Sequence, residues 1–294
     1  MIPSPSVRLL SAVPTLRDLP TLSVVLGEVV SLIGDSKVTR AHLAETLRKD
    51  QVLTAKVLRL VNSSYYARST EITDIAKALQ FLGDDSLRLL VLGTNSFQEN
   101  VTETGWFCAR EFWQNAAGTA LAAEAIAREA GLPRPEECFT CGLLQGLGKL
   151  VLHRLDPKST ETVLQRAFDQ QTSFLKAEQE LGLPGHHVLG ERLAEEWRLP
   201  LVVRKALRYS VRDLTDFPKL YPELRPAILT TSLARAMARQ LEIGFSGDHD
   251  RPEYWGGYVS ALGLDAARLI KIEREVVRKA ETMASWTKPW TNAA

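Results

Sequence analysis

Apolar residues recur at three- and four-residue spacing along nearly the whole chain, and this spacing limits the possible folds more than any other feature of the sequence. An early example is the set Leu22, Val25, Leu26, Val29 and Leu32. Residues with this spacing share one face of an α-helix, whereas convincing runs of alternating β-branched residues, the pattern typical of strands, are absent. The sequence therefore predicts an all-α fold.

Capping and stop signals divide the predicted helices into two groups. In the first group, Thr39, Asp50 and Thr73 are suited to start helices because their side chains can accept hydrogen bonds from unpaired amide groups. After a polar stretch that ends in glycine, we expect helices at about 109–130, 135–146, 148–155, 158–170, 173–181, 186–197, 200–210, 223–242 and 265–286. We divide the chain into an N-terminal tail (1–13), a bundle of about five helices (14–100), a second helical subdomain (106–242), and a C-terminal loop and helix packed on that subdomain (243–294).

The charge and apolar content favour a soluble, cytoplasmic protein. The formal net charge is +1, and acidic and basic residues are interleaved, so no basic stretch indicates direct binding to nucleic acid. No apolar run reaches the roughly 18 residues of a membrane span, and the first residues lack the pattern of a signal peptide. Cys138 and Cys141 form a single C-x-x-C without further zinc ligands at suitable spacing, so we interpret them as small residues on a helix face.

Several motifs follow one another in a specific order. The first is D-x-x-L-T-A-K-V-L-R-L-V-N-S at 50–63. The others are A-L-x-x-L-G at 78–83, F-W-Q-N-A at 112–116, C-G-L-L-Q-G-L-G-K-L at 141–150, H-x-x-x-G at 186–190 and W-x-L-P at 197–200. Together they resemble bacterial HDOD proteins, the HD-related output domain family, over about residues 14 to 240.

This resemblance implies a relationship to the HD phosphohydrolases, in which a histidine, an adjacent His-Asp pair and a later aspartate hold divalent metals that activate water. The chain differs at each matching position. Asn115 replaces the first histidine, Gln145 and Gly146 replace the pair, and Arg235 stands at the aspartate. His186 matches a position where metal-binding relatives often have histidine, although a single histidine without partners is more often a packing residue. We therefore expect no metal, no cofactor and no catalysis.

The resemblance also implies a function in bacterial signal transduction. We expect a regulatory protein that acts through other signalling proteins, such as receiver or cyclic-dinucleotide signalling components. A small-ligand sensor is the alternative, in which the cavity around Asn115, Gln145, Gly146, His186 and Arg235 would hold a nucleotide or another anion. Residual metal-dependent phosphohydrolase activity is a third hypothesis.

A candidate partner surface follows the first motif. Asn62 is suited to bridge backbone groups where a helix ends, and Tyr65, Tyr66 and Arg68 come directly after it. Tyrosines that are exposed at such a break could anchor a partner protein. The charged C-terminal helix is expected to pack on the second subdomain, with a homodimer contact as the alternative.

Aromatic residues gather near the predicted boundary between the two subdomains. They are Trp106, Phe107, Phe112 and Trp113. Large aromatic side chains bury much apolar area, so we expect this group to join the two halves of the chain, with a ligand-binding aromatic cage as the alternative.

Overall fold

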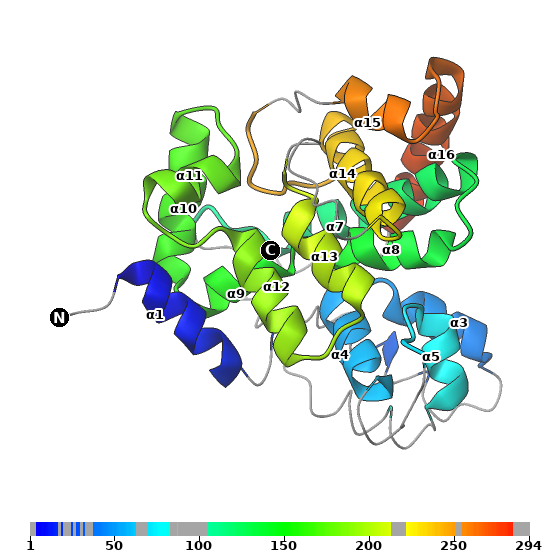
Figure 1. Cartoon of the computed structure of the whole chain (residues 1–294), viewed down its shortest axis with the longest axis horizontal. Helices are drawn as coiled ribbons and strands as arrows, with labels where there is room; N and C mark the ends of the chain where they lie inside the picture. The colour runs from blue at the N-terminus through cyan, green and yellow to red at the C-terminus, as the bar shows by residue number, and fades with distance from the viewer. Residues whose placement is uncertain are drawn as a thin grey trace, which may run out of the picture.

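The computed structural model describes residues 4–16, 38–62, 70–82, 105–212, 222–250 and 255–284, together with positions 19, 25, 28, 29, 32 and 87. Within these residues every regular element is helical, so the predicted all-α fold is confirmed (Figure 1). The helices are α1 (Pro5–Ala12), η1 (Val13–Thr15), α3 (Arg40–Leu47), α4 (Gln51–Val61), α5 (Ile75–Phe81), α7 (Ala109–Glu129), α8 (Pro135–Leu144), α9 (Leu147–Leu155), α10 (Pro157–Asp169), α11 (Phe174–Glu180), α12 (His186–Glu196), α13 (Leu201–Tyr209), α14 (Arg225–Gln240), α15 (Trp255–Ala261) and α16 (Ala266–Ala284). None of these helices is both long enough and apolar enough to cross a membrane.

Helices α3, α4 and α5 pack together on one side of the molecule (Figure 1). Thr39 caps α3 as predicted, because its hydroxyl accepts a hydrogen bond from the amide of His42 at 3.2 Å. Asp50 caps α4 in the same way. The cap of α5 is Asp74 and not the adjacent Thr73, since the Asp74 carboxylate accepts from the amide of Lys77 at 2.9 Å. In the helix predicted near residues 22–32, the described positions 25, 28, 29 and 32 are helical.

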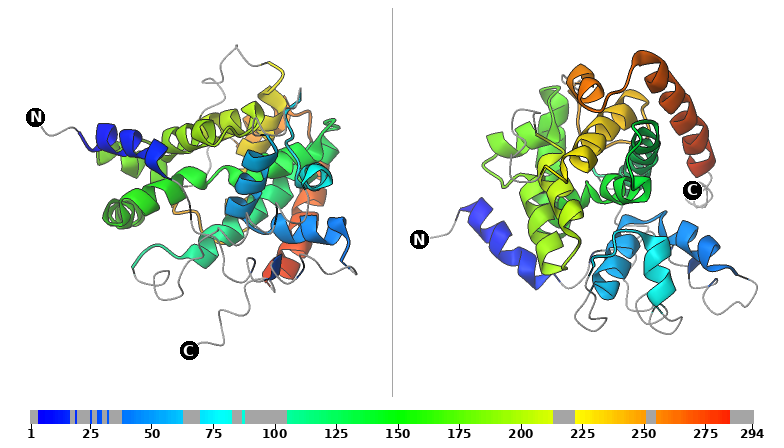
Figure 2. Two further views of the ribbon diagram at one scale, coloured as in Figure 1. Left: turned by 90° about the horizontal axis from the view of Figure 1, so that it is seen from below. Right: turned by 45° about the vertical axis from the view of Figure 1, so that its right-hand side comes forward.

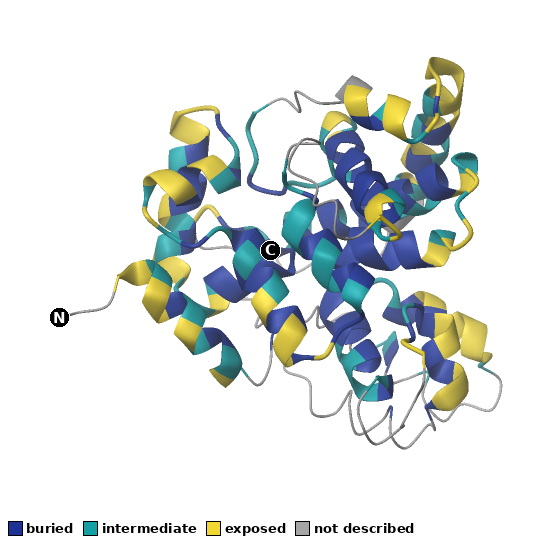
Figure 3. Cartoon of the chain, viewed as in Figure 1, coloured by how far each residue is buried: buried dark blue, intermediate teal, exposed yellow. Residues whose placement is uncertain are grey.

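Helices α7 and α8 lie at the centre of the second half, and α14 and α16 also pack against α7 (Figures 1 and 2). Small residues allow the close approach of α7 and α8. A Cβ atom at Gly142 would lie 2.8 Å from the carbonyl oxygen of Thr119 and 2.9 Å from the Cα atom of Ala120. Cys138 and Cys141 are buried on α8, so their predicted packing role is confirmed. The central helices are accordingly mostly buried, while exposed residues lie on the peripheral helices (Figure 3).

Two segments differ from the sequence-based expectation. The stretch 1–13, predicted as a tail, contains α1, which contacts α9 and α12. Helix α1 forms because Ser4 caps it and Pro5 stands at its start, where a missing amide hydrogen costs nothing. Helix α15 was not expected either, and it packs against α14.

Helix α16 packs on α7, as expected for the C-terminal helix. The buried face of α16 is formed by Ile272 and Val276, whereas Ile270 and Val277 are exposed. Ion pairs of Arg128 with Glu275 and of Lys271 with Glu129 border the contact.

Candidate functional site

The five residues singled out by the resemblance come from three helices and one short connection. Asn115 lies on α7, Gln145 and Gly146 connect α8 to α9, His186 begins α12, and Arg235 lies on α14. Asn115, Gln145 and His186 are all buried. Of the five, only Arg235 lines the large cavity described below.

Asn115 acts as a structural anchor. Its side-chain amide donates a hydrogen bond to the carbonyl oxygen of Ile243 at 3.2 Å, where the chain leaves α14. Gly244 follows with φ of +59°, and a Cβ atom there would lie 2.3 Å from the carbonyl oxygen of Glu111. Asn115, which replaces the first histidine of the HD phosphohydrolases, therefore holds the segment after α14 against α7.

The connection between α8 and α9 leaves little room for a metal ligand at position 146. A Cβ atom on Gly146 would lie 3.0 Å from the ring of Phe112. Two residues later, a Cβ atom on Gly148 would lie only 1.8 Å from the carbonyl oxygen of His186. Gly190 faces Gly148 from α12, so these glycines explain why α9 and α12 can touch backbone to backbone.

His186 is held by Glu178. Both its backbone amide and its Nδ1 atom lie within hydrogen-bond distance of Glu178 Oε2, at 2.9 Å and 2.8 Å. Burial lowers the pKa of His186 well below its usual value, and Lys149 and Arg235 lower it further. Burial also raises the pKa of Glu178 well above its usual value. Both shifts favour uncharged forms, so we assign a neutral imidazole that donates from Nδ1 to Glu178.

A lysine ammonium group fills the interior next to this pair. Lys149 is only 3% exposed, and its Nζ atom donates to Asp248 Oδ2 at 3.0 Å and to the carbonyl oxygen of Ser246 at 2.6 Å. The Nζ atom also lies 4.6 Å from the centre of the Phe174 ring, a distance at which a cation is attracted to an aromatic face. All of these groups accept or attract a positive charge, so Lys149 is held as an ammonium ion.

Asp248 is the group that stabilises this ammonium. Besides Lys149, it accepts hydrogen bonds from the Ser246 hydroxyl at 2.7 Å and from the backbone amide of Phe174 at 2.9 Å. Burial raises the pKa of Asp248, but Lys149, Arg239 and Arg235 outweigh this effect and hold the pKa well below its usual range. Burial lowers the pKa of Lys149, and Asp248 opposes that shift. The pair is therefore a buried ion pair, Lys149 to Asp248.

This donor set does not fit a divalent metal. Among the described residues, no three His, Cys, Asp or Glu side chains are grouped so that they could hold an ion. Within the part of the chain that the structure describes, Asp248 is the one carboxylate paired with Lys149, and the lysine together with Arg235 at 3.9 Å neutralises it. Glu178 and His186 pair with each other, so the described residues offer no ligand shell for the metal that the family relationship implies.

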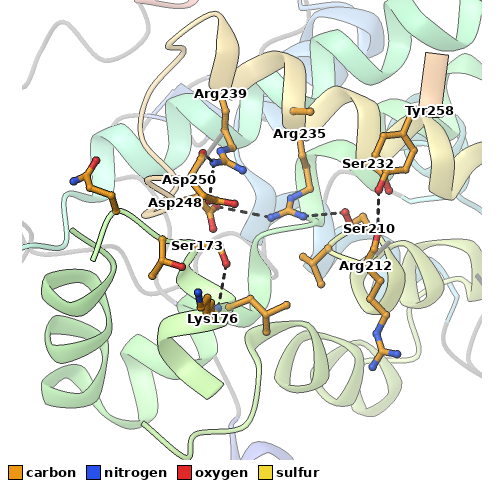
Figure 4. A pocket seen from close by; sticks show the side chains of 15 residues that line it. Ser173, Lys176, Ser210, Arg212, Ser232, Arg235, Arg239, Asp248, Asp250 and Tyr258 are labelled. Carbon is orange, nitrogen blue, oxygen red and sulfur yellow. Dashed lines mark hydrogen bonds and ion pairs between the residues drawn. The ribbon is translucent and has the colours of Figure 1, made fainter. Parts of the chain in front are cut away.

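Arg235 extends toward a cavity of about 400 Å³ (Figure 4). Its Nη1 atom donates to the carbonyl oxygen of Ser210 at 2.9 Å, and its Nη2 atom lies 3.9 Å from Asp248. Arg239, one turn further along α14, is bound to Asp250. The walls come from α11, the end of α13, α14, the loop before α15, and Tyr258.

Sequence reasoning missed Lys149, Glu178, Asp248 and Arg239. Lys149 lies in the motif at 141–150, where the resemblance assigned roles only to Gln145 and Gly146. The segment S-G-D-H-D at 246–250 is an ordinary cluster of turn-forming residues, so the sequence carries no signal that marks Asp248 as the partner of Lys149. The turn suits glycine at position 247, where φ is +86°.

Asn62 has the structural role that its position suggested. Its side-chain amide donates to the carbonyl oxygens of Leu58 and Ile72 at 3.0 Å and 2.8 Å, and its oxygen accepts from the amide of Ile72 at 2.8 Å. Asn62 thereby links the end of α4 to Ile72, just before α5. Tyr65, Tyr66 and Arg68, the other members of the candidate partner surface, lie outside the described residues.

The aromatic group is divided between two environments. Trp113 reaches the first half of the chain, since its Nε1 atom donates to Asp50. Trp106 instead packs on Phe168 of α10, and Phe107 stacks on His153 of α9 at 4.1 Å between ring centres. The expectation that the aromatics join the two halves is therefore confirmed for Trp113, whereas Trp106 and Phe107 pack within the second half.

Comparison with known proteins finds the same fold in other solved structures. Similar solved structures include the MmoQ response regulator from Methylococcus capsulatus, with 23% identity, a TM-score of 0.66 and coverage of 87% of this chain and 98% of that chain. A virulence factor from Campylobacter jejuni has 17% identity and a TM-score of 0.70, covering 92% and 96% of the two chains. At such identities the likeness shows the fold alone.

An uncharacterized protein from Treponema pallidum is 23% identical over 228 residues, which is 76% of this chain. The chain spans less than half of that relative, 43% of its length. The family model for the HDOD domain matches residues 19–212, which is most of the chain and includes the motifs from Asp50 to Pro200. The chain therefore belongs to the HDOD domain family.

Proposed function

We propose that this HDOD protein is a non-catalytic, cytoplasmic signal-transduction protein that acts by binding other proteins. The observation that carries the proposal is the buried ion pair of Lys149 with Asp248, which lies beside Glu178 and His186. The positively charged Lys149 neutralises the Asp248 carboxylate, which would otherwise be available to bind a metal ion. The proposal therefore rests on two features. Lys149 fills the interior beside Asp248. The positions where the HD phosphohydrolases have metal ligands are occupied by other residues: Asn115, Gln145, Gly146 and Arg235.

Electrostatic magnitudes support the loss of metal-dependent chemistry. A divalent ion about 4 Å from one buried cation would be repelled by about 8 kcal/mol at an effective dielectric constant of 20. Lys149 and Arg235 would both contribute to such repulsion, because both lie beside Asp248. Without a bound metal, water keeps its ordinary pKa and no hydroxide is available for attack on a phosphoester.

Action through partners is supported by the family and by the structural neighbours. The chain matches the HDOD domain model, and one solved structure with the same fold is described as a response regulator. Receiver proteins and cyclic-dinucleotide signalling proteins are the partners we propose. A homodimer remains the alternative assembly.

An activity assay tests the non-catalytic part of the proposal. Purified protein is incubated with Mn²⁺, Fe²⁺ or Mg²⁺ and with phosphodiesters that include bis-p-nitrophenyl phosphate and cyclic dinucleotides. We expect no turnover above that of the Asp248→Asn variant, which changes the buried ion pair. Metal-dependent turnover by the wild-type protein that the variant loses would support residual phosphohydrolase activity instead.

A genetic assay tests the part that concerns partners. The gene is deleted from its native bacterium, and the phenotype is complemented with the wild-type gene or with variants of exposed residues. We expect a surface variant that loses one purified signalling partner in a binding assay to fail in complementation as well. If every variant that abolishes partner binding still complements fully, the protein acts in another way.

A further inference from the structure

The large cavity beside the buried ion pair has the dimensions of a small-molecule site. Its volume of about 400 Å³ falls within the range of roughly 300 to 1,000 Å³ that is common for ligand pockets. Residues from four places in the fold form its walls: α11, the end of α13, α14, and the loop that carries Asp248 (Figure 4). Tyr258 closes one side, where its hydroxyl donates to the carbonyl oxygen of Arg212 at 3.0 Å.

Positive charge exceeds negative charge in the cavity wall. Four cationic side chains contribute to it: Lys176, Arg212, Arg235 and Arg239. The two carboxylates in the wall are those of Asp248 and Asp250. The Asp248 carboxylate is already shared with Lys149 at 3.0 Å, which lies behind the wall and adds a further positive charge. The lining itself has two more positive than negative side chains, and Lys149 raises the excess to three, so an anion of about two charges would neutralise most of it.

Hydrogen-bond donors remain available on the same wall. Arg235 uses Nη1 for one hydrogen bond to a backbone carbonyl, and its contact with Asp248 is a longer ion pair at 3.9 Å. A guanidinium group has five N–H donors in a fixed planar arrangement, so several can still bind a ligand oxygen. The hydroxyl of Ser210, a residue only 3% exposed, is buried in the wall without a hydrogen-bond partner among the described residues. Such an unpaired polar atom is costly unless something binds it.

The electrostatic environment of Arg235 also favours the binding of an anion. Burial lowers the pKa of Arg235, and Arg239 lowers it further, while Asp248 only partly compensates. The two guanidinium groups on successive turns of α14 repel each other, and the carboxylates of Asp248 and Asp250 beside them reduce this repulsion. Leu175, Val211 and Ala236 supply apolar parts of the wall, which an inorganic ion would leave uncovered.

We propose that this cavity binds a small organic phosphate, with a phosphomonoester group held by Arg235, Lys176 and Ser210 and an organic part against Leu175, Val211 and Ala236. The site differs from the vestigial site expected from the sequence, because Asn115, Gln145, Gly146 and His186 do not line it. Arg235, Arg239 and Tyr258 lie beyond the stretch that matches the HDOD model, residues 19–212. Binding at this site would give the protein a small-molecule input in addition to the proposed protein partners.

Calorimetric titration of the full chain tests the site directly. The probes are inorganic phosphate, adenosine and guanosine 5′-monophosphates, glucose 6-phosphate, and the matching uncharged nucleosides and glucose. We expect at least one organic phosphate to bind more tightly than inorganic phosphate, and the uncharged compounds not to bind. Nucleoside monophosphates and glucose 6-phosphate distinguish a nucleotide from a sugar phosphate as the source of the phosphate group.

Variants assign the binding to the cavity. Lys176→Gln changes an exposed side chain that makes no side-chain hydrogen bond or ion pair among the described residues, so the variant should fold normally. Loss of one charge-assisted hydrogen bond should weaken binding about tenfold in Lys176→Gln and more in Arg235→Gln. Arg225→Gln, an exposed position on the same helix outside the cavity, is the matched control and should bind as the wild type does.

Three results would overturn the proposal: no phosphate-bearing probe binds, inorganic phosphate binds as tightly as every organic phosphate, or both cavity variants bind like the wild type. Because titration measures binding and not turnover, each of these results would leave the non-catalytic assignment standing. Recovery of the probe after titration shows separately whether it has been hydrolysed.

Discussion

The indole Nε1 atom of Trp113 donates a hydrogen bond to Oδ2 of Asp50 at 2.9 Å, and both residues are buried. The other carboxylate oxygen of Asp50 accepts from the amides of Val52 and Leu53, each at 2.8 Å. A single carboxylate thus caps α4 and binds α7, which lies in the other half of the chain. Two of the family motifs, at 50–63 and 112–116, meet at this hydrogen bond.

Trp113→Phe should destabilise the protein by about 1 to 3 kcal/mol, because it keeps an aromatic ring but removes a hydrogen bond to a buried carboxylate. The measurement is urea unfolding followed by far-ultraviolet circular dichroism. Trp106→Phe is the control, since the Trp106 side chain is 42% exposed, and its effect should be well under 1 kcal/mol. Equal effects of the two substitutions would contradict the role of the hydrogen bond.

Gly148→Ala should cost about 3 kcal/mol, because the added methyl group would overlap the backbone of α12 at His186 and the two helices would have to separate. Thermal unfolding provides the measurement. Gly131→Ala serves for comparison: that glycine has φ of +68° and open space around it, so only backbone strain of about 1 kcal/mol is expected. A Gly148→Ala protein as stable as Gly131→Ala would show that α9 and α12 are not in such close contact.

Lys149→Met should destabilise the fold by about 3 to 5 kcal/mol, since it leaves the buried Asp248 carboxylate without its nearest cation. The double variant Lys149→Met with Asp248→Asn should recover part of this loss, because the side chain at position 248 then no longer carries an unpaired negative charge. Lys279→Met, which breaks a more exposed pair with Glu275, should cost less than about 1 kcal/mol. Purely additive effects of Lys149→Met and Asp248→Asn would argue against coupling of the two groups.

Acid should destabilise the protein partly through His187. Burial, followed by Arg208 and Arg212, lowers the pKa of His187 from 6.5 to about 4. The unfolded chain therefore takes up a proton near pH 6.5 that the folded chain takes up only near pH 4, so stability is lost as the pH falls between these values. By pH 5 the loss from this residue should be about 2 kcal/mol.

The variant His187→Gln tests this contribution, because it cannot titrate in that range. Its unfolding free energy should fall less between pH 8 and pH 5 than that of the wild type. His42→Gln changes an exposed histidine and is the control. The same pH dependence in His187→Gln as in the wild type would show that another group causes the loss.

The helices of the second half could be predicted closely because their boundaries depend on local signals. The expected helix at 158–170, for example, is α10 (Pro157–Asp169), which Asp156 caps with its side chain. Helix α1 was missed since it is short, although Ser4 and Pro5 are the residues of a helix start. Local sequence thus predicts where helices begin more reliably than which short segments are helical at all.

The candidate site could be predicted only in part. Two replaced positions, Asn115 and Gln145, lie in the interior, and so does His186, which matches a histidine of metal-binding relatives. The ion pair could not be anticipated, because Asp248 follows Lys149 by 99 residues and lies on a loop whose course depends on packing against α7 and α11. Helical periodicity identifies Lys149 as one residue of α9, but it contains no information on which distant loop meets that residue.

The metal content of the protein tests the central claim most directly. The chain is purified without chelators from cells grown with added manganese, iron and zinc, and the metals are measured by mass spectrometry together with the protein concentration. The buried Lys149–Asp248 pair predicts metal far below one ion per chain, and no increase after incubation with Mn²⁺. One or two ions per chain that remain after gel filtration and are lost in Asp248→Asn would contradict the account.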